Sequence, residues 1–234
     1  MTRVMVGPIS GLHTFLKIYA KSPRALFRYT PSTGVPTKKP RRFGQLDGNG
    51  NFETIKNHFC MEELFREIIQ KYRQLRSETD QLVTRLEQQH RPHMQCRQGC
   101  DQCCMDYRIF PVEFYAIAEE LKGVPPQTEA DAGADDCIFL INHACTIYAS
   151  RPFICRTHGL PLLYANDDGE WELSACELNF TEFDGDFHAR NTFPQDRFNS
   201  RLFMLNKKFI TLPEFSRFGE FDLLPLRDLA AEIK

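Results

Sequence analysis

Hydrophobic residues recur every three or four positions between Asn51 and His90, with charged residues between them. This spacing predicts one long amphipathic helix, or two helices with a break near Ser77. Pro92 ends the pattern, because proline disfavours helical geometry in the residue before it. The predicted helix leads directly into a cysteine-rich segment that begins at Cys96. Its apolar positions are Ile55, Phe59, Phe65, Ile68, Ile69, Tyr72, Leu75, Leu82, Val83 and Leu86.

Three shorter helical segments follow in the second half of the chain. Pro111 suits the first position of a helix that ends at Gly123. A second helix follows Pro194, where apolar residues keep helical spacing up to Phe209. A last helix is predicted to start at Pro225.

Two short β-hairpins are predicted between these helices. In the first, residues 138–141 and 146–148 flank a turn at residues 142–145. In the second, the segments LPLLY and EWELS flank NDDG, and its Asp-Gly step favours a tight turn. The pattern as a whole predicts a mainly α protein with small β-hairpins, formed as a single irregular domain.

Composition places the chain among soluble globular proteins. Of its 234 residues, 42% are hydrophobic and 26% are charged. No apolar run approaches the roughly 18 residues that a membrane span requires. We therefore expect no membrane span, and a reducing cytoplasmic location is the default because no secretory signal is evident.

The basic residues are unevenly distributed. Residues 1–46 hold nine Lys and Arg and no Asp or Glu, whereas the rest of the chain carries 20 basic and 31 acidic residues. We therefore divide the chain into a basic N-terminal arm at 1–50 and a cysteine-cluster domain at 51–234. The arm is expected to be partly disordered or a targeting segment; its KKPRR sequence also suits nucleic acid, although such a partner is the least favoured interpretation.

The stretch CRQGCDQCC concentrates four of the nine cysteines in nine residues. Four interpretations are open: a helical stripe of buried thiols, a disulfide knot, a redox pair formed by Cys100 and Cys103, and a metal site. Export is not indicated and a nucleophile needs only one thiol, so the metal site is favoured. Adjacent Cys103 and Cys104 are expected to diverge and to serve different metal atoms.

Further cysteines lie at predicted turns and strand ends, where loops can converge. Eight cysteines are therefore candidate ligands, and Cys60 on the long helix is left as a bystander. Thiolates favour zinc, cuprous copper or iron in an iron–sulfur cluster. The candidate ligands are Cys96, Cys100, Cys103, Cys104, Cys137, Cys145, Cys155 and Cys176.

Basic and imidazole side chains near the cysteines are candidates for a supporting role. The arginines adjacent in sequence are Arg97, Arg108, Arg151 and Arg156. Of these, we select Arg97 and Arg156 as residues that donate hydrogen bonds to metal-bound sulfur. His143 and His158 are candidate additional ligands.

The chain contains the pattern C-x3-C-x2-CC, followed by CIFL, CTIY, Arg151-Pro152 and Cys155-Arg156. This pattern resembles the CxxCxxCC cysteine-cluster family, which is YkgJ-like and is described as zinc- or iron-chelating. The resemblance covers residues 96–176 clearly. It implies that the first seven candidate cysteines are ligands, while Cys176 looks like the ending of longer members. The family includes part of a flagellin lysine methylase, but no G-x-G-x-x-G loop follows a strand here, so enzymatic activity is not inferred.

Three functions are consistent with these residues. The first is an iron–sulfur protein that acts in electron transfer, metal handling or assistance to a partner enzyme. The second is a structural zinc module that mediates protein or nucleic-acid interaction. The third is a thiol oxidoreductase. Iron–sulfur is favoured over zinc because only Cys100 and Cys103 have the C-x2-C spacing typical of zinc sites. The oligomeric state is left open.

Overall fold

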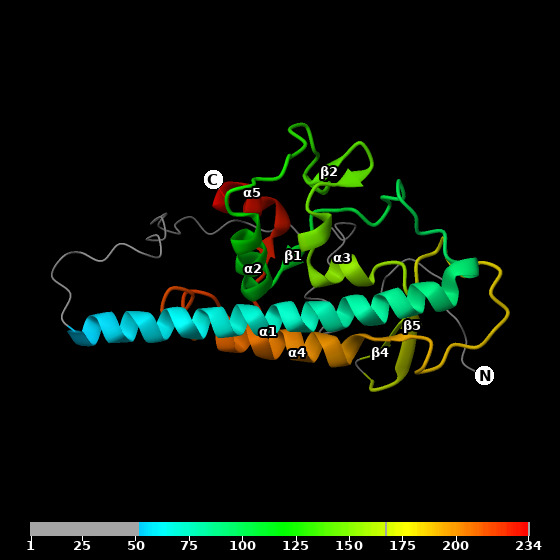
Figure 1. Ribbon diagram of the computed structural model, residues 1–234. Helices are drawn as coiled ribbons and strands as arrows, with labels where there is room; N and C mark the ends of the chain where they lie inside the picture. The colour runs from blue at the N-terminus through cyan, green and yellow to red at the C-terminus, as the bar shows by residue number, and fades with distance from the viewer. Residues whose placement is uncertain (1–51, 167, 234) are drawn as a thin grey trace.

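The computed structural model describes residues 52–166 and 168–233 (Figure 1). The predicted basic arm at 1–50 lies outside the described residues. The helices are α1 (Phe52–His90), α2 (Pro111–Leu121), α3 (Phe153–Thr157), α4 (Gln195–Phe209) and α5 (Leu229–Glu232), with 3-10 turns at Arg91–His93, Tyr148–Ser150 and Leu226–Asp228. The strands are β1 (Arg108–Ile109), β2 (Leu140–Ile141), β3 (Ala144–Cys145), β4 (Leu162–Ala165), β5 (Trp171–Ser174), β6 (Phe193–Pro194) and β7 (Leu224–Pro225).

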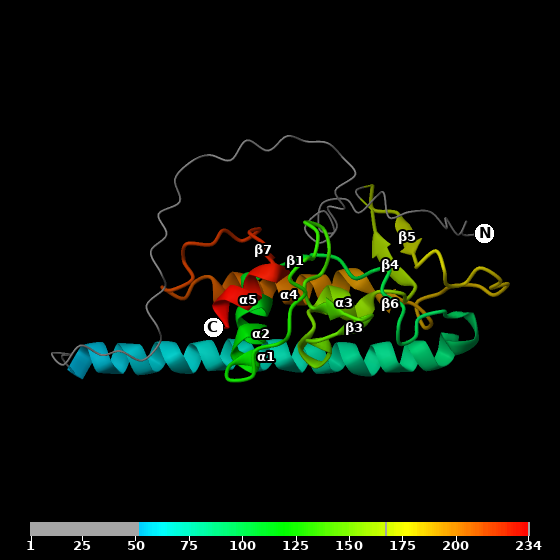
Figure 2. The same ribbon diagram turned by 90° about the horizontal axis from the view of Figure 1, so that it is seen from above.

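The long helix α1 forms the axis of the molecule (Figures 1 and 2). It is continuous, so the prediction of one helix without a break at Ser77 is confirmed. Helix α4 runs antiparallel along it, while α2 and α3 cover a second side. This arrangement follows from the periodic apolar positions of α1, which must be covered by other apolar surface.

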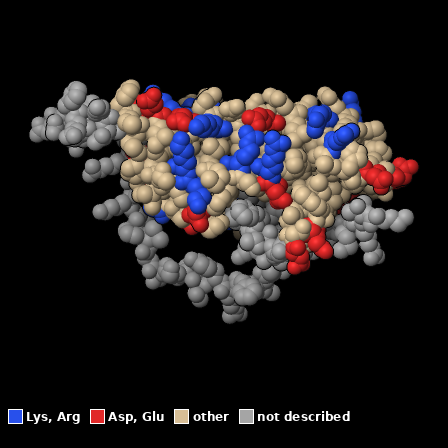
Figure 3. All heavy atoms as spheres, turned by 90° about the horizontal axis from the view of Figure 1, so that it is seen from below, with Lys and Arg blue, Asp and Glu red and all other residues tan. Residues whose placement is uncertain are grey.

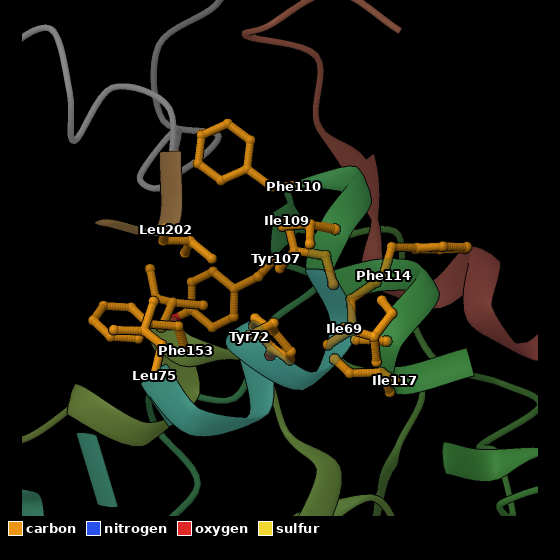
Figure 4. Close-up of a cluster of buried hydrophobic side chains, with 14 of the residues drawn as sticks. Ile69, Tyr72, Leu75, Tyr107, Ile109, Phe110, Phe114, Ile117, Phe153 and Leu202 are labelled. Carbon is orange, nitrogen blue, oxygen red and sulfur yellow. The ribbon is translucent and has the colours of Figure 1, made fainter. Parts of the chain in front are cut away.

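The hydrophobic core lies where α1, α2, α3 and α4 meet (Figure 4). Each fully buried aliphatic or aromatic side chain contributes roughly 1.5–3 kcal/mol when it leaves water. Burial of these side chains is therefore the main favourable contribution to the packing of the helices. Fully buried members of the core include Ile68, Tyr72, Leu75, Leu86, Ile109, Ile117, Phe153, Leu202 and Phe209.

The strands are short and form three small antiparallel or mixed sheets among the described residues. β4 and β5 form the predicted second hairpin, with Gly169 in the left-handed conformation at its turn. β6 adds to β4 in parallel, and β1 pairs with the distant β7. These two long-range pairings have no signal in the local sequence pattern.

Charged side chains of both signs lie beside one another on the face seen in Figure 3. Ion pairs join α4 to α1: Arg201 lies 2.6 Å from Glu78, and Lys208 lies 3.2 Å from Glu67. None of the helices in the described part of the chain combines the length and the hydrophobicity that a bilayer crossing requires.

Candidate metal centre

The CRQGCDQCC run folds as two consecutive turns rather than as a helix. The N–H of Cys100 donates to the carbonyl of Arg97 at 3.0 Å, and the N–H of Cys104 donates to that of Asp101 at 2.7 Å. Gly99 has a φ of +91°, which interrupts any helix. The interpretation of these cysteines as a helical stripe is therefore wrong.

A backbone bridge places Cys104 opposite Cys137. Met105 and Asp136 form an isolated antiparallel bridge, and the N–H of Asp106 donates a 2.9 Å hydrogen bond across the same pairing. In antiparallel pairing, the residue before one partner faces the residue after the other. The second cysteine segment thus meets the first through its main chain.

The β2–β3 hairpin brings Cys137 and Cys145 to its base. Cys145 pairs with Leu140, whose N–H donates to the carbonyl of Cys137 at 3.1 Å. The turn contains only Asn142 and His143, at φ of 48° and 60°. The sequence prediction of a four-residue turn was therefore wrong, because these two residues adopt the left-handed conformations of a two-residue hairpin turn.

Helix α3, which carries Cys155, is attached to the helical core by a buried carboxylate. Glu113 of α2 is fully buried and accepts hydrogen bonds from the N–H of Phe153 at 2.9 Å and from the hydroxyl of Tyr72 at 3.3 Å. A buried carboxylate of this kind needs such donors to offset its desolvation. The third cysteine segment is consequently fixed against α1 and α2.

Arg156 provides a second attachment of α3. Its side chain donates to both carboxylate oxygens of Asp80 on α1 at 2.6 and 2.7 Å, and to the carbonyls of Arg151 and Ala149 at 2.8 and 2.6 Å. Among the described residues it has no sulfur partner. The exposed side chain of Arg97 has no hydrogen-bond partner within the same residues. Arg156 therefore holds the segment that precedes Cys155 against α1.

Asn179 joins Cys96 to Cys176. Its buried side chain donates to the sulfur of Cys96 at 3.2 Å and to the carbonyl of Gly159 at 2.8 Å, and it accepts from the N–H of Gln95 at 2.7 Å. Its own N–H donates to the carbonyl of Cys176 at 2.9 Å. Asn179 has no signal in the sequence pattern, because its side-chain partners lie 20 to 84 residues away.

Gly159 leaves the space that the Cys96 sulfur occupies. A Cβ atom at this position would lie 2.5 Å from that sulfur, and the glycine has a φ of +89°. A side chain here would collide with the sulfur and would strain the backbone. Gly159 is therefore a second residue that positions Cys96.

The thiols lie close enough to influence one another. Burial is the main cause that raises the pKa of Cys155 well above its usual value, and the thiols of Cys137, Cys145 and Cys103 raise it further. Burial also raises the pKa of Cys96, with a further contribution from neighbouring thiols. Deprotonation of such thiols requires a compensating positive charge, which a metal ion supplies.

Cys103 and Cys104 lie side by side. A hydrogen bond with the Cys104 thiol lowers the pKa of Cys103 to about 7 and raises that of Cys104. The expectation that these two side chains diverge is therefore wrong. The turn that ends at Cys104 brings the two sulfurs together instead.

Arg151 supplies positive charge beside the thiols. Burial raises the pKa of both Cys145 and Cys155, and the Arg151 guanidinium opposes this effect at each. The guanidinium lies 3.7 Å from the ring centre of Tyr148, and within the described residues its buried Nε has no hydrogen-bond partner. In the sequence Arg151 is only one of four arginines near the cysteines, and it is not among the two that we selected there.

The two candidate histidines have different surroundings. Burial lowers the pKa of His158 to about 4, its ring packs 5.1 Å from that of Tyr107, and its buried Nε2 lacks a partner within the described residues. The Tyr107 hydroxyl in turn donates to the carbonyl of Cys103 at 2.8 Å. His143, at the hairpin tip, has its Nδ1 2.6 Å from a carboxylate oxygen of Asp101.

Cys60 is exposed near the start of α1. All nine cysteines are free thiols. Over residues 52–166 and 168–233, no three Cys, His, Asp or Glu side chains are arranged to hold a metal ion directly. The described residues therefore do not by themselves show the metal site that the sequence predicts.

The donors nevertheless suit a soft metal. Thiols from separate chain segments lie near the guanidinium of Arg151, which acts on both Cys145 and Cys155 and whose buried Nε lacks a partner in the described part of the chain. Thiolates bind zinc and iron strongly, and an adjacent donor can hydrogen-bond to metal-bound sulfur. These features describe a helical scaffold that carries a thiol-rich module whose donors suit a soft metal.

Residues 95–177 match the family model CxxCxxCC, described as "Putative zinc- or iron-chelating domain". The recognition of this family is confirmed over that segment, which includes all eight clustered cysteines. Searches of curated proteins and of solved structures gave no significant match.

Proposed function

We propose that this chain is an iron–sulfur protein whose eight clustered cysteines bind the metal. The observation that carries this proposal is the gathering of thiols from separate segments by specific main-chain and side-chain contacts, while the ninth cysteine stays apart on α1. The match to a zinc- or iron-chelating family supports metal binding itself.

Iron–sulfur is preferred to zinc for two reasons. Eight thiols exceed what a single four-coordinate zinc ion requires, and only Cys100 and Cys103 have the C-x2-C spacing frequent in zinc modules. The positive charge of Arg151 and its unpartnered Nε also fit a cluster, because hydrogen bonds to sulfur and local charge set the reduction potential. When bound, a cluster would supply one-electron redox chemistry.

The protein residues would hold the cluster and adjust its surroundings. Cys155 and its neighbours would provide a buried environment, while Arg151 would compensate negative charge. Arg97 and Arg156 stay proposals as direct donors to sulfur. The roles that we propose are electron transfer, metal handling or assistance to a partner enzyme, in the reducing cytoplasm.

A structural zinc module is the second candidate. It is favoured by the attachment of the Cys155 segment to the helical core through Glu113 and Arg156, because a structural metal typically fixes loops against a scaffold. In that case the fixed loops would mediate contacts with a protein or nucleic acid. The domain division at residues 50 and 51 belongs to both proposals.

Purification without oxygen or chelator, followed by elemental analysis, labile sulfide assay and visible absorption, tests the assignment. Iron and sulfide in comparable amounts with broad visible absorption are expected. Colourless protein that contains zinc would replace the first proposal by the second. Protein free of both metals would contradict both.

A further inference from the structure

Three of the clustered thiols pack against the edge of the hydrophobic core, and the backbone sets a fourth, Cys104, opposite one of them. The backbone bridge sets Cys104 opposite Cys137, and the β2–β3 hairpin joins Cys137 to Cys145. Cys137, Cys145 and Cys155 all pack against the core. We call Cys104, Cys137, Cys145 and Cys155 the inner group.

The other four thiols depend on loop contacts. Asn179 connects Cys96 to the turn at Cys176, and Cys100 lies in the first turn of the cysteine run. Cys96 and Cys103 are exposed. Within the described residues, none of the four packs against the hydrophobic core. We call Cys96, Cys100, Cys103 and Cys176 the outer group.

The Cys103–Cys104 pair forms the boundary between the groups. Cys103 is exposed, whereas Cys104 is half-buried and faces Cys137 across the bridge. Of the two, only Cys104 is set opposite an inner thiol by the backbone bridge, although the thiols of the two residues lie side by side.

We propose that the inner and outer groups form two adjoining metal sites, and that the outer site exchanges its metal with the surroundings while the inner site is structural. This inference rests on the proposed function, because it divides the same eight ligands. It assigns the metal-handling role to the outer group, whose metal a small chelator or a partner protein can reach.

Asn179 is the positioning residue of the outer site. Its side-chain amide contacts the Cys96 sulfur and fixes the adjacent segments, yet it touches none of the inner thiols. Asn179→Ala keeps all eight cysteines. Loss of a supporting hydrogen bond to a metal ligand typically weakens metal binding about 10- to 100-fold. The outer site alone should show this loss.

The test follows thiol exposure during metal removal from the full-length protein, purified anaerobically with its own metal. EDTA and iodoacetamide are added together, and the labelling rate of each cysteine is measured by peptide mass spectrometry alongside the metal that remains. We expect two phases. The outer four cysteines should be labelled together as about half of the metal leaves, and the inner four should follow together.

Exposed cysteines could be labelled early simply because the reagent reaches them first, so variants are needed to assign each phase to a metal site. Cys96→Ser should remove the early metal phase and leave the late one; Asn179→Ala should accelerate only the early phase, by about tenfold or more. Cys60→Ser is the control with both phases intact. A lowered thermal midpoint would reveal a variant that folds poorly. An unchanged late phase would show that the inner site of the same variant is intact.

The outcomes distinguish failure of the division into two sites from failure of metal binding itself. One phase that releases all eight thiols, or phases that mix the two groups, would overturn the division while metal binding stands. Labelling rates that do not respond to the chelator, in protein without metal, would overturn the proposed function and this inference with it.

Discussion

The helical body and the cysteine-bearing loops of this molecule are stabilised in different ways. In the helical body, α1, α2 and α4 bury a continuous set of large apolar side chains, including Ile68, Leu86 and Phe209. The loops that carry the thiols contain two-residue strands, short turns and a five-residue helix. Hydrophobic burial therefore accounts for the body, whereas the loops depend on a few hydrogen bonds and, in our account, on metal.

This contrast explains where a metal is needed. A helix packed on a core forms without ligands, but loops with little buried apolar surface must offset their ordering entropy in another way. Metal binding supplies that free energy in small modules. The body should therefore persist without metal, and the loops should not.

Metal removal is expected to give the largest difference between the regions. Binding of a structural metal contributes roughly 10–16 kcal/mol in small zinc modules, so its loss should release the loops at residues 94–106 and 137–150. Hydrogen exchange measured with and without metal should show loss of protection there, and retained protection over residues 68–86 of α1. Equal loss in both regions would show that the body also depends on metal.

A substitution in the hydrophobic core should destabilise the helical body even when no metal is bound. Phe209 is fully buried, and its ring centre lies 4.2 Å from that of Phe215. Phe209→Ala should lower the free energy of unfolding of the metal-free body by about 3–5 kcal/mol, measured by urea denaturation and circular dichroism. Met204→Ala, on the exposed side of the same helix, should change it by no more than about 0.5 kcal/mol. Similar values for both variants would contradict the described packing of α4.

The Asp80–Arg156 contact tests the link between the two regions. Asp80→Asn weakens the hydrogen bonds between a carboxylate that is 43% exposed and a guanidinium that is only 5% exposed, and should cost roughly 1–2 kcal/mol of unfolding free energy because solvent screens part of the interaction. The metal should also leave faster, because α3 carries Cys155. The matched control is Glu78→Gln, which breaks an ion pair with Arg201 that is 39% exposed at both side chains and should cost at most about 1 kcal/mol. Unchanged metal release in Asp80→Asn would show that this contact does not transmit stability to the loops.

The smallest effect is expected at Cys60. Its thiol is exposed on α1, apart from the clustered cysteines. Cys60→Ser should leave both metal content and the thermal midpoint unchanged, as measured by elemental analysis and calorimetry. A loss of metal in this variant would show that the division of the nine cysteines is wrong.

Local patterns in the sequence predict the three longer helices well and the strands only in part; they miss α3, and the predicted start of the last helix at Pro225 is wrong because Pro225 lies in β7 and α5 begins at Leu229. The α1 periodicity, the proline that starts α2 and the Asp-Gly turn between β4 and β5 are local signals, and each element forms as expected. The pairing of β1 with β7 joins residues that are more than a hundred positions apart. Such a pairing depends on how the helices pack, which no local pattern records.

The candidate site shows the same limit. Thiol spacing and family resemblance identify the cysteines, because soft metal ligands are a chemical signal in the residue type itself. The sequence could not identify Asn179 or select Arg151, because their roles come from segments that meet only in the fold. The contacts of Arg156 with Asp80 could not be foreseen for the same reason.

X-ray absorption at the metal edge of the native, anaerobically purified protein tests the central claim most directly. The account predicts a first shell of sulfur atoms alone, at about 2.3 Å if the metal is zinc or at the corresponding iron–thiolate and iron–sulfide distances. Protein without bound zinc or iron, or a metal surrounded by oxygen and nitrogen, would contradict it.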